Sequence, residues 1–273
     1  MITEQVMARY DREGYAILDQ VVPSESLGRV QESYEETIEA ALSLGLAPLD
    51  EATGFLEGYR FQNPHHPSLA RRPLMEALGA PAIMAFAQRL CGEDAAMHGV
   101  AAFAMNEEYD YRSSWHRDSY FAWGKDSPTE RRLREVERLP ATQVLVALED
   151  DASFWYVPGS HNRANTAEEE EGYDEGISGW DAETVRPGAV QVRLEAGSAA
   201  PFDARGIHRG LKGPGVRRRS LFIIYGDAGL AAESSVVSDW AREPEYADTA
   251  WLDSLPEPFR RSMERTMAAL REA

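Results

Sequence analysis

The residues that decide the fold are 143–161, which read QVLVALEDDASFWYVPGSH. An apolar, partly β-branched run ends at the acidic residues Glu149, Asp150 and Asp151, and a second short apolar run follows at 154–157. Turn-forming residues between two short apolar runs are typical of neighbouring strands, and the Pro-Gly pair that follows ends the second run. The stretch therefore predicts two strands joined by a short acidic turn.

The same pattern of short apolar runs separated by Gly, Pro and Asp extends from about residue 95 to residue 226. The predicted strands are 98–105, 142–148, 154–157, 190–194, 198–202 and 220–225. Many short strands with this spacing are typical of a jelly-roll barrel. We therefore expect a fold that is mainly β with helical cover, a double-stranded β-helix of the jelly-roll, cupin-like type.

The residues on either side of this region have the longer amphipathic pattern of helices. Helices are predicted over 3–11, 27–44, 74–90 and the charged insertion 129–138, and from Asp239 to Ala273; a strand is predicted at 14–18 and a mobile loop at 168–175. Pro23, Ser24 and Glu25 offer N-cap chemistry before the second helix. Trp240 and Trp251 are expected to pack on the sheet.

These elements predict a single domain over residues 1–273. Its helical N-terminal part would cover about 1–92, the jelly-roll core about 95–226, and a C-terminal helical segment about 239–273.

Composition restricts the classes of partner. The net charge of −18 argues against nucleic acid, whose phosphates need a basic footprint. No run approaches the ~20 apolar residues of a membrane-spanning helix, and the first residues lack the basic start and apolar run of a signal peptide. The single cysteine, Cys91, cannot form an internal disulfide. We expect a cytoplasmic protein that binds neither nucleic acid nor membrane and acts on a small molecule.

The residues with the clearest chemistry are His116 and Asp118, followed about ninety residues later by His208. In an extended segment, residues i and i+2 point to the same side, so His116 and Asp118 can hold one ion. Two imidazoles and one carboxylate form the facial triad that binds non-haem Fe(II) and leaves positions open for substrate and oxygen. A His-x-Asp pair by itself is also common at surfaces and in cores, so the neighbouring residues decide its interpretation.

Four blocks occur in a consistent order: 114–118 (SWHRD), 143–161, 197–203 (GSAAPFD) and 206–210 (GIHRG) with Arg219 on the next strand. In this order they resemble the phytanoyl-CoA dioxygenase family of Fe(II)- and 2-oxoglutarate-dependent oxygenases. The resemblance covers about residues 95–226, and the N-terminal segment YDREGYAILDQVV is similar to that family's opening helix and strand. The turn after Asp151 is shorter than the family's usual NGPL turn.

The resemblance implies roles for five residues. His116, Asp118 and His208 would bind iron, Arg219 would pair with the distal carboxylate of 2-oxoglutarate, and Gln143 would contact the same co-substrate. The implied cofactors are Fe(II), 2-oxoglutarate and O2, with ascorbate as an optional reductant. Because related halogenases carry a small residue in place of this aspartate, Asp118 favours hydroxylation of an unactivated C–H bond, with release of succinate and CO2.

Several alternatives stay open. Arg217 or Arg218 could replace Arg219 through a register shift, since alternation along a strand points Arg218 away from the other two. His161 is interpreted as a turn residue, His65 and His66 as loop residues, and His98 as a strand residue. The candidates for a substrate pocket, each of which could equally belong to the core, are Tyr59, Arg60, Gln62, Tyr120, Phe121, Trp123 and Trp155.

Two other functions would fit parts of the pattern. A cupin-type oxygenase uses the same iron triad without 2-oxoglutarate, and Arg219 is the residue that argues against it. A catalytically silent jelly-roll module could bind a ligand or a partner protein, and an intact triad argues against that. The arginines around His208 favour a substrate with an anionic group, whereas the overall acidity disfavours a coenzyme A thioester.

Overall fold

The computed structural model describes residues 2–52, 55–58, 60–69, 71–93, 95–231, 240 and 243–272. Asp239 and Ala273, the ends of the predicted C-terminal helical segment, lie outside the described residues, as does Tyr59. Within the described part, no helix is both long enough and apolar enough to cross a membrane.

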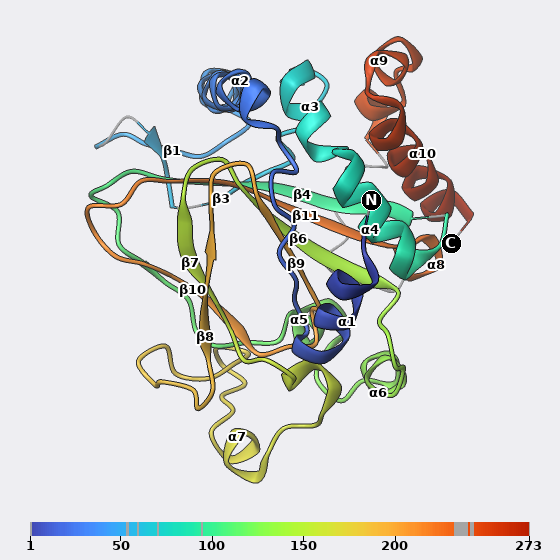
Figure 1. The fold of residues 1–273 in the computed structure, drawn as a ribbon. Helices are drawn as coiled ribbons and strands as arrows, with labels where there is room; N and C mark the ends of the chain where they lie inside the picture. Colours follow the sequence, from blue (N-terminus) through green and yellow to red (C-terminus); the bar gives the residue numbers. More distant parts are fainter. Residues whose placement is uncertain are drawn as a thin grey trace.

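Two antiparallel sheets face each other (Figure 1). The larger sheet contains, in order, β3 (Arg60–Gln62), β4 (Ala95–Met105), β11 (Arg218–Asp227), β6 (Ala141–Ala147) and β9 (Ala199–Phe202). The smaller sheet contains β5 (Tyr111–Arg112), β10 (His208–Lys212), β7 (Asp151–Tyr156) and β8 (Val190–Leu194). This arrangement confirms the predicted double-stranded β-helix.

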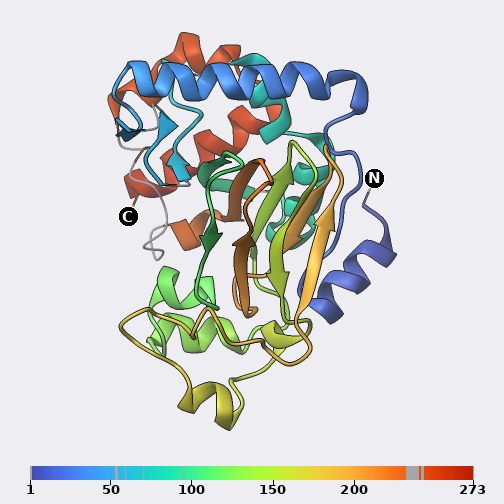
Figure 2. The same cartoon turned by 90° about the vertical axis from the view of Figure 1, so that its left-hand side faces the viewer.

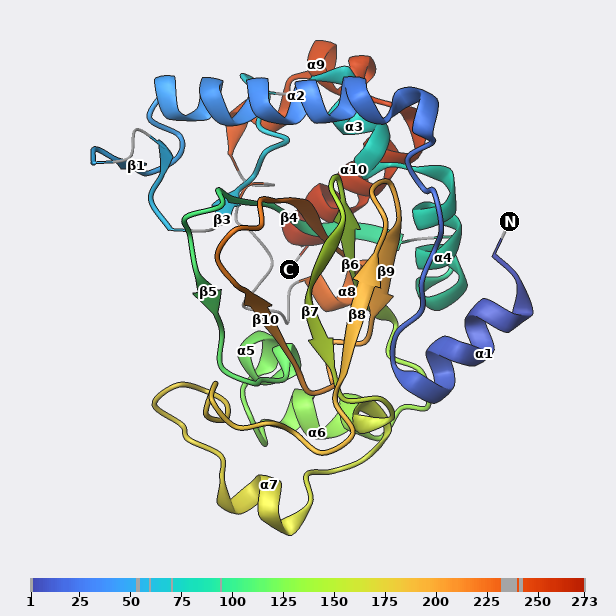
Figure 3. The same ribbon diagram turned by 60° about the vertical axis from the view of Figure 1, so that its left-hand side comes forward.

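Helices cover the outer face of the larger sheet and both ends of the sheet pair. The longer ones are α1 (Glu4–Glu13), α2 (Ser24–Ser43), α4 (Pro81–Cys91) and α10 (Glu257–Glu272), and the shorter ones are α3 (Arg72–Leu78), α5 (Asp118–Trp123), α6 (Pro128–Arg134), α7 (Ala167–Glu171), α8 (Ala228–Ala231) and α9 (Thr249–Ser254). A two-stranded sheet of β1 (Leu49–Asp50) and β2 (Phe55–Leu56) follows α2. Figures 2 and 3 show α2 across one end of the two sheets and α5, α6 and α7 at the other.

Strand β11 separates the interior between the sheets from the helical layer. Leu221 and Ile223 are fully buried in the main core with Phe86 of α4 and Met263 of α10. Phe222, between them, packs instead with a second cluster that draws on both sheets. Because side chains alternate along a strand, the even-numbered residues of β11 face the interior and the odd-numbered ones face the helices.

Three segments differ from the sequence-based expectation. The helix predicted over 74–90 is divided into α3 and α4, because α4 begins at Pro81, which offers no backbone donor and restricts the residue before it. The predicted strand at 14–18 forms only isolated bridges, from Tyr15 to Phe202 and from Leu18 to Ala199. The predicted loop at 168–175 instead contains most of α7, which Thr166 and Glu169 stabilise with a capping box.

The predictions that Trp240 and Trp251 pack on the sheet and that the N-terminal part is helical are met in part. Trp240 is buried, and its ring packs against His65 and Tyr246 with centroids 5.0 and 5.1 Å apart. Trp251 of α9 contacts the same tyrosine. The N-terminal region is not only helical, because β3 pairs with β4 and extends the larger sheet.

The outer face of β11 should carry much of the stability. We predict that Leu221→Ala lowers the free energy of unfolding by about 2–5 kcal/mol, since it removes a fully buried side chain and leaves a cavity. Val216→Ala is the control, because Val216 lies in an exposed turn and should change stability by less than about 0.5 kcal/mol. Urea denaturation measures both; equal effects of the two substitutions would contradict this assignment of the core.

Candidate metal centre

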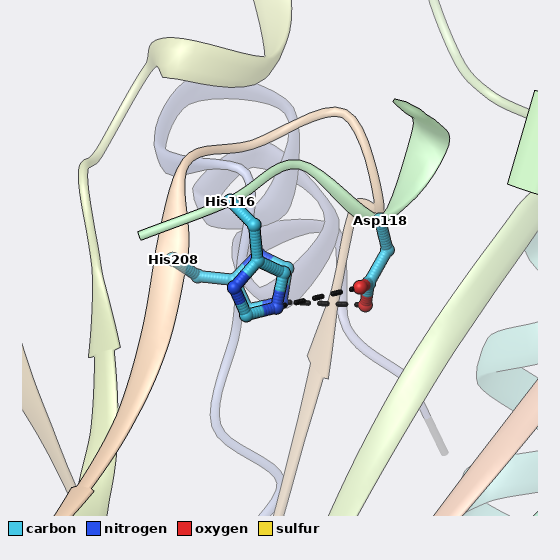
Figure 4. A group of neighbouring side chains, drawn as sticks. All are labelled: His116, Asp118 and His208. Atoms are coloured by element: carbon cyan, nitrogen blue, oxygen red, sulfur yellow. Dashed lines mark ion pairs between the residues drawn. The ribbon is translucent and has the colours of Figure 1, made fainter. Parts of the chain in front are cut away.

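His116 and His208 lie directly opposite each other in an antiparallel bridge. The backbone N–H of His116 donates to the carbonyl oxygen of His208 at 2.9 Å, and the N–H of His208 donates to the carbonyl oxygen of His116 at the same distance. Directly opposed residues point their side chains to the same side of a sheet. The two imidazole rings therefore lie beside each other, with centroids 4.4 Å apart (Figure 4).

Asp118 joins the two histidines because Arg117, between His116 and Asp118, is extended, with φ −115° and ψ 121°. One carboxylate oxygen lies 3.5 Å from Nε2 of His116, and the other lies 3.3 Å from Nε2 of His208. A ligand atom from each residue can be chosen so that all three lie within 4.8 Å of one another. The structure thus brings together the three residues expected to hold a metal.

Backbone carbonyls fix which nitrogen of each imidazole faces the centre. Nδ1 of His116 lies 2.7 Å from the carbonyl oxygen of Ser114, and Nδ1 of His208 lies 3.0 Å from that of Gly206. A carbonyl only accepts, so in a neutral ring Nδ1 carries the hydrogen and Nε2 presents a lone pair. Burial and the neighbouring His208 lower the pKa of His116 to about 4, which favours the neutral ring.

The charge on Asp118 completes a set of donors that suits a cation. Burial raises the pKa of its carboxyl, but His208, His116 and a hydrogen bond from Gln143 outweigh this and hold that pKa below its usual range. When both rings are neutral, two Nε2 lone pairs and the carboxylate face one another with no hydrogen between them. A metal cation that accepts imidazole and carboxylate ligands, such as Fe(II), satisfies this arrangement.

Gln143 contacts the metal centre through Asp118. It lies on β6, is 4% exposed, and its side chain hydrogen bonds to Asp118. It is not among the residues that line the cavity in front of the histidines. The contact of Gln143 with a co-substrate stays a prediction, and the position of Gln143 is that of a residue that orients Asp118.

A cavity of about 440 Å³ opens in front of the three residues. Six of the sixteen described residues that line it are Phe or Tyr, and three are arginines. The described lining residues are Arg60, Phe103, Tyr111, Ser113, Ser114, His116, Asp118, Phe121, Leu145, Phe154, Phe202, His208, Arg209, Gly210, Arg218 and Phe222. Of the pocket candidates from the sequence, Arg60 and Phe121 line it, whereas Gln62, Tyr120, Trp123 and Trp155 do not.

The structure places Arg218, and not Arg219, on the cavity wall. Nε of Arg218 donates to Asp151 at 2.9 Å, and both side chains are buried. Arg219 points to the helical side, where it donates to Glu35 at 2.6 Å and to the carbonyl oxygen of Met105 at 3.0 Å. Arg219 therefore lies outside the cavity, because β11 enters the sheet with Arg218 on its inner face, one residue closer to His208 than the sequence predicts.

The segment after α7 pairs with the extended segment that carries His116. Trp115 forms an antiparallel bridge with Trp180, and its indole Nε1 donates to the carbonyl oxygen of Thr184 at 2.7 Å. The guanidinium of Arg209 lies over the rings of Trp115 and Trp155, 4.4 and 5.5 Å from their centroids, and donates to Ala182. The sequence alone does not predict that the segment after α7 packs on Trp115, although a tryptophan directly before His116 indicates that this position is packed against something.

One comparison with known proteins agrees with the geometry, and another finds no match. A family model described as phytanoyl-CoA dioxygenase (PhyH) matches residues 10–219. No curated protein matches the chain.

Solved structures share the fold at low sequence identity. The epimerase SnoN in complex with Fe3+, alpha ketoglutarate and nogalamycin RO is 21% identical, with a TM-score of 0.58, over 83% of this chain and 84% of that one. EctD from S. alaskensis with bound Fe is 18% identical, with a TM-score of 0.62, over 83% and 77%. The carbocyclase SnoK from nogalamycin biosynthesis is 18% identical, with a TM-score of 0.58, over 83% and 85%.

The close packing of Gly206 against Tyr156, next to His208, yields a prediction about metal affinity. A Cβ atom on Gly206 would lie 1.6 Å from the hydroxyl oxygen of Tyr156, so Gly206→Ala must displace either the carbonyl that orients His208 or the buried Tyr156 ring that stacks on His208. We predict a loss of Fe(II) affinity of about 10- to 100-fold, typical for the loss of a group that orients a metal ligand. Gly213→Ala is the control, since nothing lies within 4 Å of a Cβ there. Anaerobic calorimetry measures both, and wild-type affinity in Gly206→Ala would contradict the role given to this carbonyl.

Proposed function

The chain belongs to the phytanoyl-CoA dioxygenase family and is an Fe(II)- and 2-oxoglutarate-dependent dioxygenase, and on this premise we propose that it hydroxylates an unactivated C–H bond of a small molecule, with release of succinate and CO2. The observation that carries the proposal is the convergence of His116, Asp118 and His208 at one end of an aromatic cavity. Three protein ligands leave further positions on an iron ion for the other reactants.

The metal would be held by Nε2 of His116, Nε2 of His208 and the carboxylate of Asp118. When bound, Fe(II) supplies the chemistry that couples the oxidative decarboxylation of 2-oxoglutarate by O2 to the oxidation of the substrate. The chain holds the ligand atoms in place before binding, because both Nδ1 hydrogens are engaged by carbonyl oxygens and Gln143 fixes the carboxylate.

Arg218 is the residue that we assign to the distal carboxylate of 2-oxoglutarate. Asp151 accepts from its Nε and is itself held by the backbone N–H of Ser153 at 2.7 Å. Among the described residues, neither terminal nitrogen of Arg218 has a hydrogen-bond partner, so that edge of the guanidinium can form a two-point contact with a carboxylate.

The aromatic wall suits the step that a hydroxylase must control. Phe154 and Phe202 pack against the ring of His208, with centroids 5.9 and 5.0 Å from it, and Phe121 packs against His116 at 5.6 Å. Such rings exclude water from the centre and give an apolar substrate a fixed surface to lie against. We therefore assign the wall to positioning a C–H bond next to the metal.

The first test is succinate formation from 2-oxoglutarate by anaerobically reconstituted protein after the addition of O2. We predict slow turnover without a substrate in the wild type and in His66→Ala, and at least about a 100-fold loss in His116→Ala, which removes a metal ligand. Metal content is measured in parallel. A protein that binds Fe(II) and oxidises substrates without 2-oxoglutarate would be a cupin-type oxygenase. A protein that binds neither Fe(II) nor 2-oxoglutarate would be a ligand-binding module.

The second test separates the two neighbouring arginines. We predict that Arg218→Gln raises the KM for 2-oxoglutarate by about 10- to 100-fold, the range expected for the loss of a charge-assisted contact, whereas Arg219→Gln changes it by less than about threefold. Arg218→Lys should recover part of the affinity. Thermal unfolding of each variant reports any damage from leaving Asp151 or Glu35 unpaired. The reverse order of the two KM effects would contradict the assignment.

A further inference from the structure

The cavity carries positive charge although the chain as a whole is acidic. The net charge is −18, yet the Arg, Lys, Asp and Glu residues on the cavity wall are Arg60, Arg209, Arg218 and Asp118. Asp118 belongs to the metal centre. A cleft with one sign of charge concentrates small ions of the opposite sign, even where the rest of the surface repels them.

Two of the three arginines on the cavity wall already have an assigned role. Arg218 pairs with Asp151 and is assigned to 2-oxoglutarate. The guanidinium of Arg209 is covered by two indole rings and donates to Ala182, so it holds the segment after α7. Arg60 is the remaining cation.

Arg60 lies at an open edge of the larger sheet. It begins the edge strand β3, pairs in register with Phe103 of β4, and is exposed. Its guanidinium carbon is 5.8 Å from the ring centre of Phe103 and 5.7 Å from that of Phe222, two aromatic residues of the cavity wall. The charge is thus held against the apolar surface on which a substrate would lie.

No carboxylate neutralises Arg60 among the residues that the structure describes. With the Gln62 amide turned so that its oxygen faces Arg60, that oxygen accepts from Nε at 2.8 Å and from Nη2 at 3.0 Å. This neutral contact orients the guanidinium without cancelling its charge. An oriented and uncompensated guanidinium at the edge of a cavity is suited to an acidic group on a ligand.

We propose that the substrate is an organic anion with an apolar body, and that Arg60 binds its acidic group while the phenylalanine wall binds the rest. This inference rests on the proposed function, because it names the class of substrate for the same cavity. Arg60 on β3 of the larger sheet and the metal centre beside His208 on β10 of the smaller sheet would then hold two parts of one molecule. The ion pair would fix which C–H bond reaches the metal centre, which makes Arg60 a specificity-determining residue.

The test compares two dyes that differ by one sulfonate group. 8-Anilinonaphthalene-1-sulfonate is an anion with an aromatic body, and N-phenyl-1-naphthylamine is its neutral counterpart. Their fluorescence is titrated anaerobically against protein loaded with Fe(II) and saturating 2-oxoglutarate, so that Arg218 is occupied. The variants are Arg60→Gln and Arg60→Lys, with Arg72→Gln as the control because Arg72 is an exposed arginine on α3 outside the cavity.

We expect Arg60→Gln to weaken the sulfonate dye by about three- to tenfold and the neutral dye by less than about twofold. Arg60→Lys should keep part of the preference for the anion, Arg72→Gln should change neither dye, and added salt should reduce the difference. Equal loss of both dyes in Arg60→Gln would show that Arg60 serves only as packing and would overturn the proposal. The proposal would also be overturned if Arg60→Gln bound the sulfonate dye as tightly as the wild type does, or if the wild type did not bind that dye.

The same samples show whether the proposed function or this inference has failed. The visible charge-transfer band of the Fe(II)–2-oxoglutarate complex reports co-substrate binding directly. If the band does not form in the wild type, the proposed function is wrong. If it forms but is weakened in Arg60→Gln, Arg60 is a second contact for 2-oxoglutarate and the proposed substrate class is wrong.

Discussion

The bridge between His116 and His208 is the constraint on which the rest of the site depends. Two backbone hydrogen bonds of 2.9 Å lock these residues opposite each other, so that their rings are neighbours before any metal arrives. A backbone carbonyl two residues earlier in the chain then fixes the orientation of each ring through a hydrogen bond to Nδ1. Since Asp118 follows His116 by two residues of extended chain, one local pairing sets the position of all three ligands.

Alternation along β11 divides the work between the two faces of the larger sheet. Arg218 and Phe222 face the cavity, whereas Leu221 and Ile223 face the helices and form the core. A shift of one residue would bury Arg218 in the helical layer and move the core residues into the cavity. Folding and function therefore require the same register, and the stability of the helical layer keeps the inner arginine in place.

The sequence predicts the strands and the metal ligands because both depend on short-range patterns. Apolar runs of period two are visible without a structure, and His116-Arg117-Asp118 needs only an extended backbone to converge. The sequence favours Arg219, whereas the structure places Arg218 on the cavity wall, because the choice depends on where β11 begins after the turn from β10 and no local pattern fixes that position. The positions of Gln143 behind Asp118 and of Arg60 on the wall depend on pairing between strands distant in sequence.

The most direct test of this account is a crystal structure of the protein with Fe(II) and 2-oxoglutarate, obtained without oxygen. The account predicts one iron ion bound by Nε2 of His116, Nε2 of His208 and the carboxylate of Asp118, with the distal carboxylate of 2-oxoglutarate on the terminal nitrogens of Arg218. A metal bound elsewhere, or a co-substrate whose distal carboxylate contacts Arg219, would contradict it.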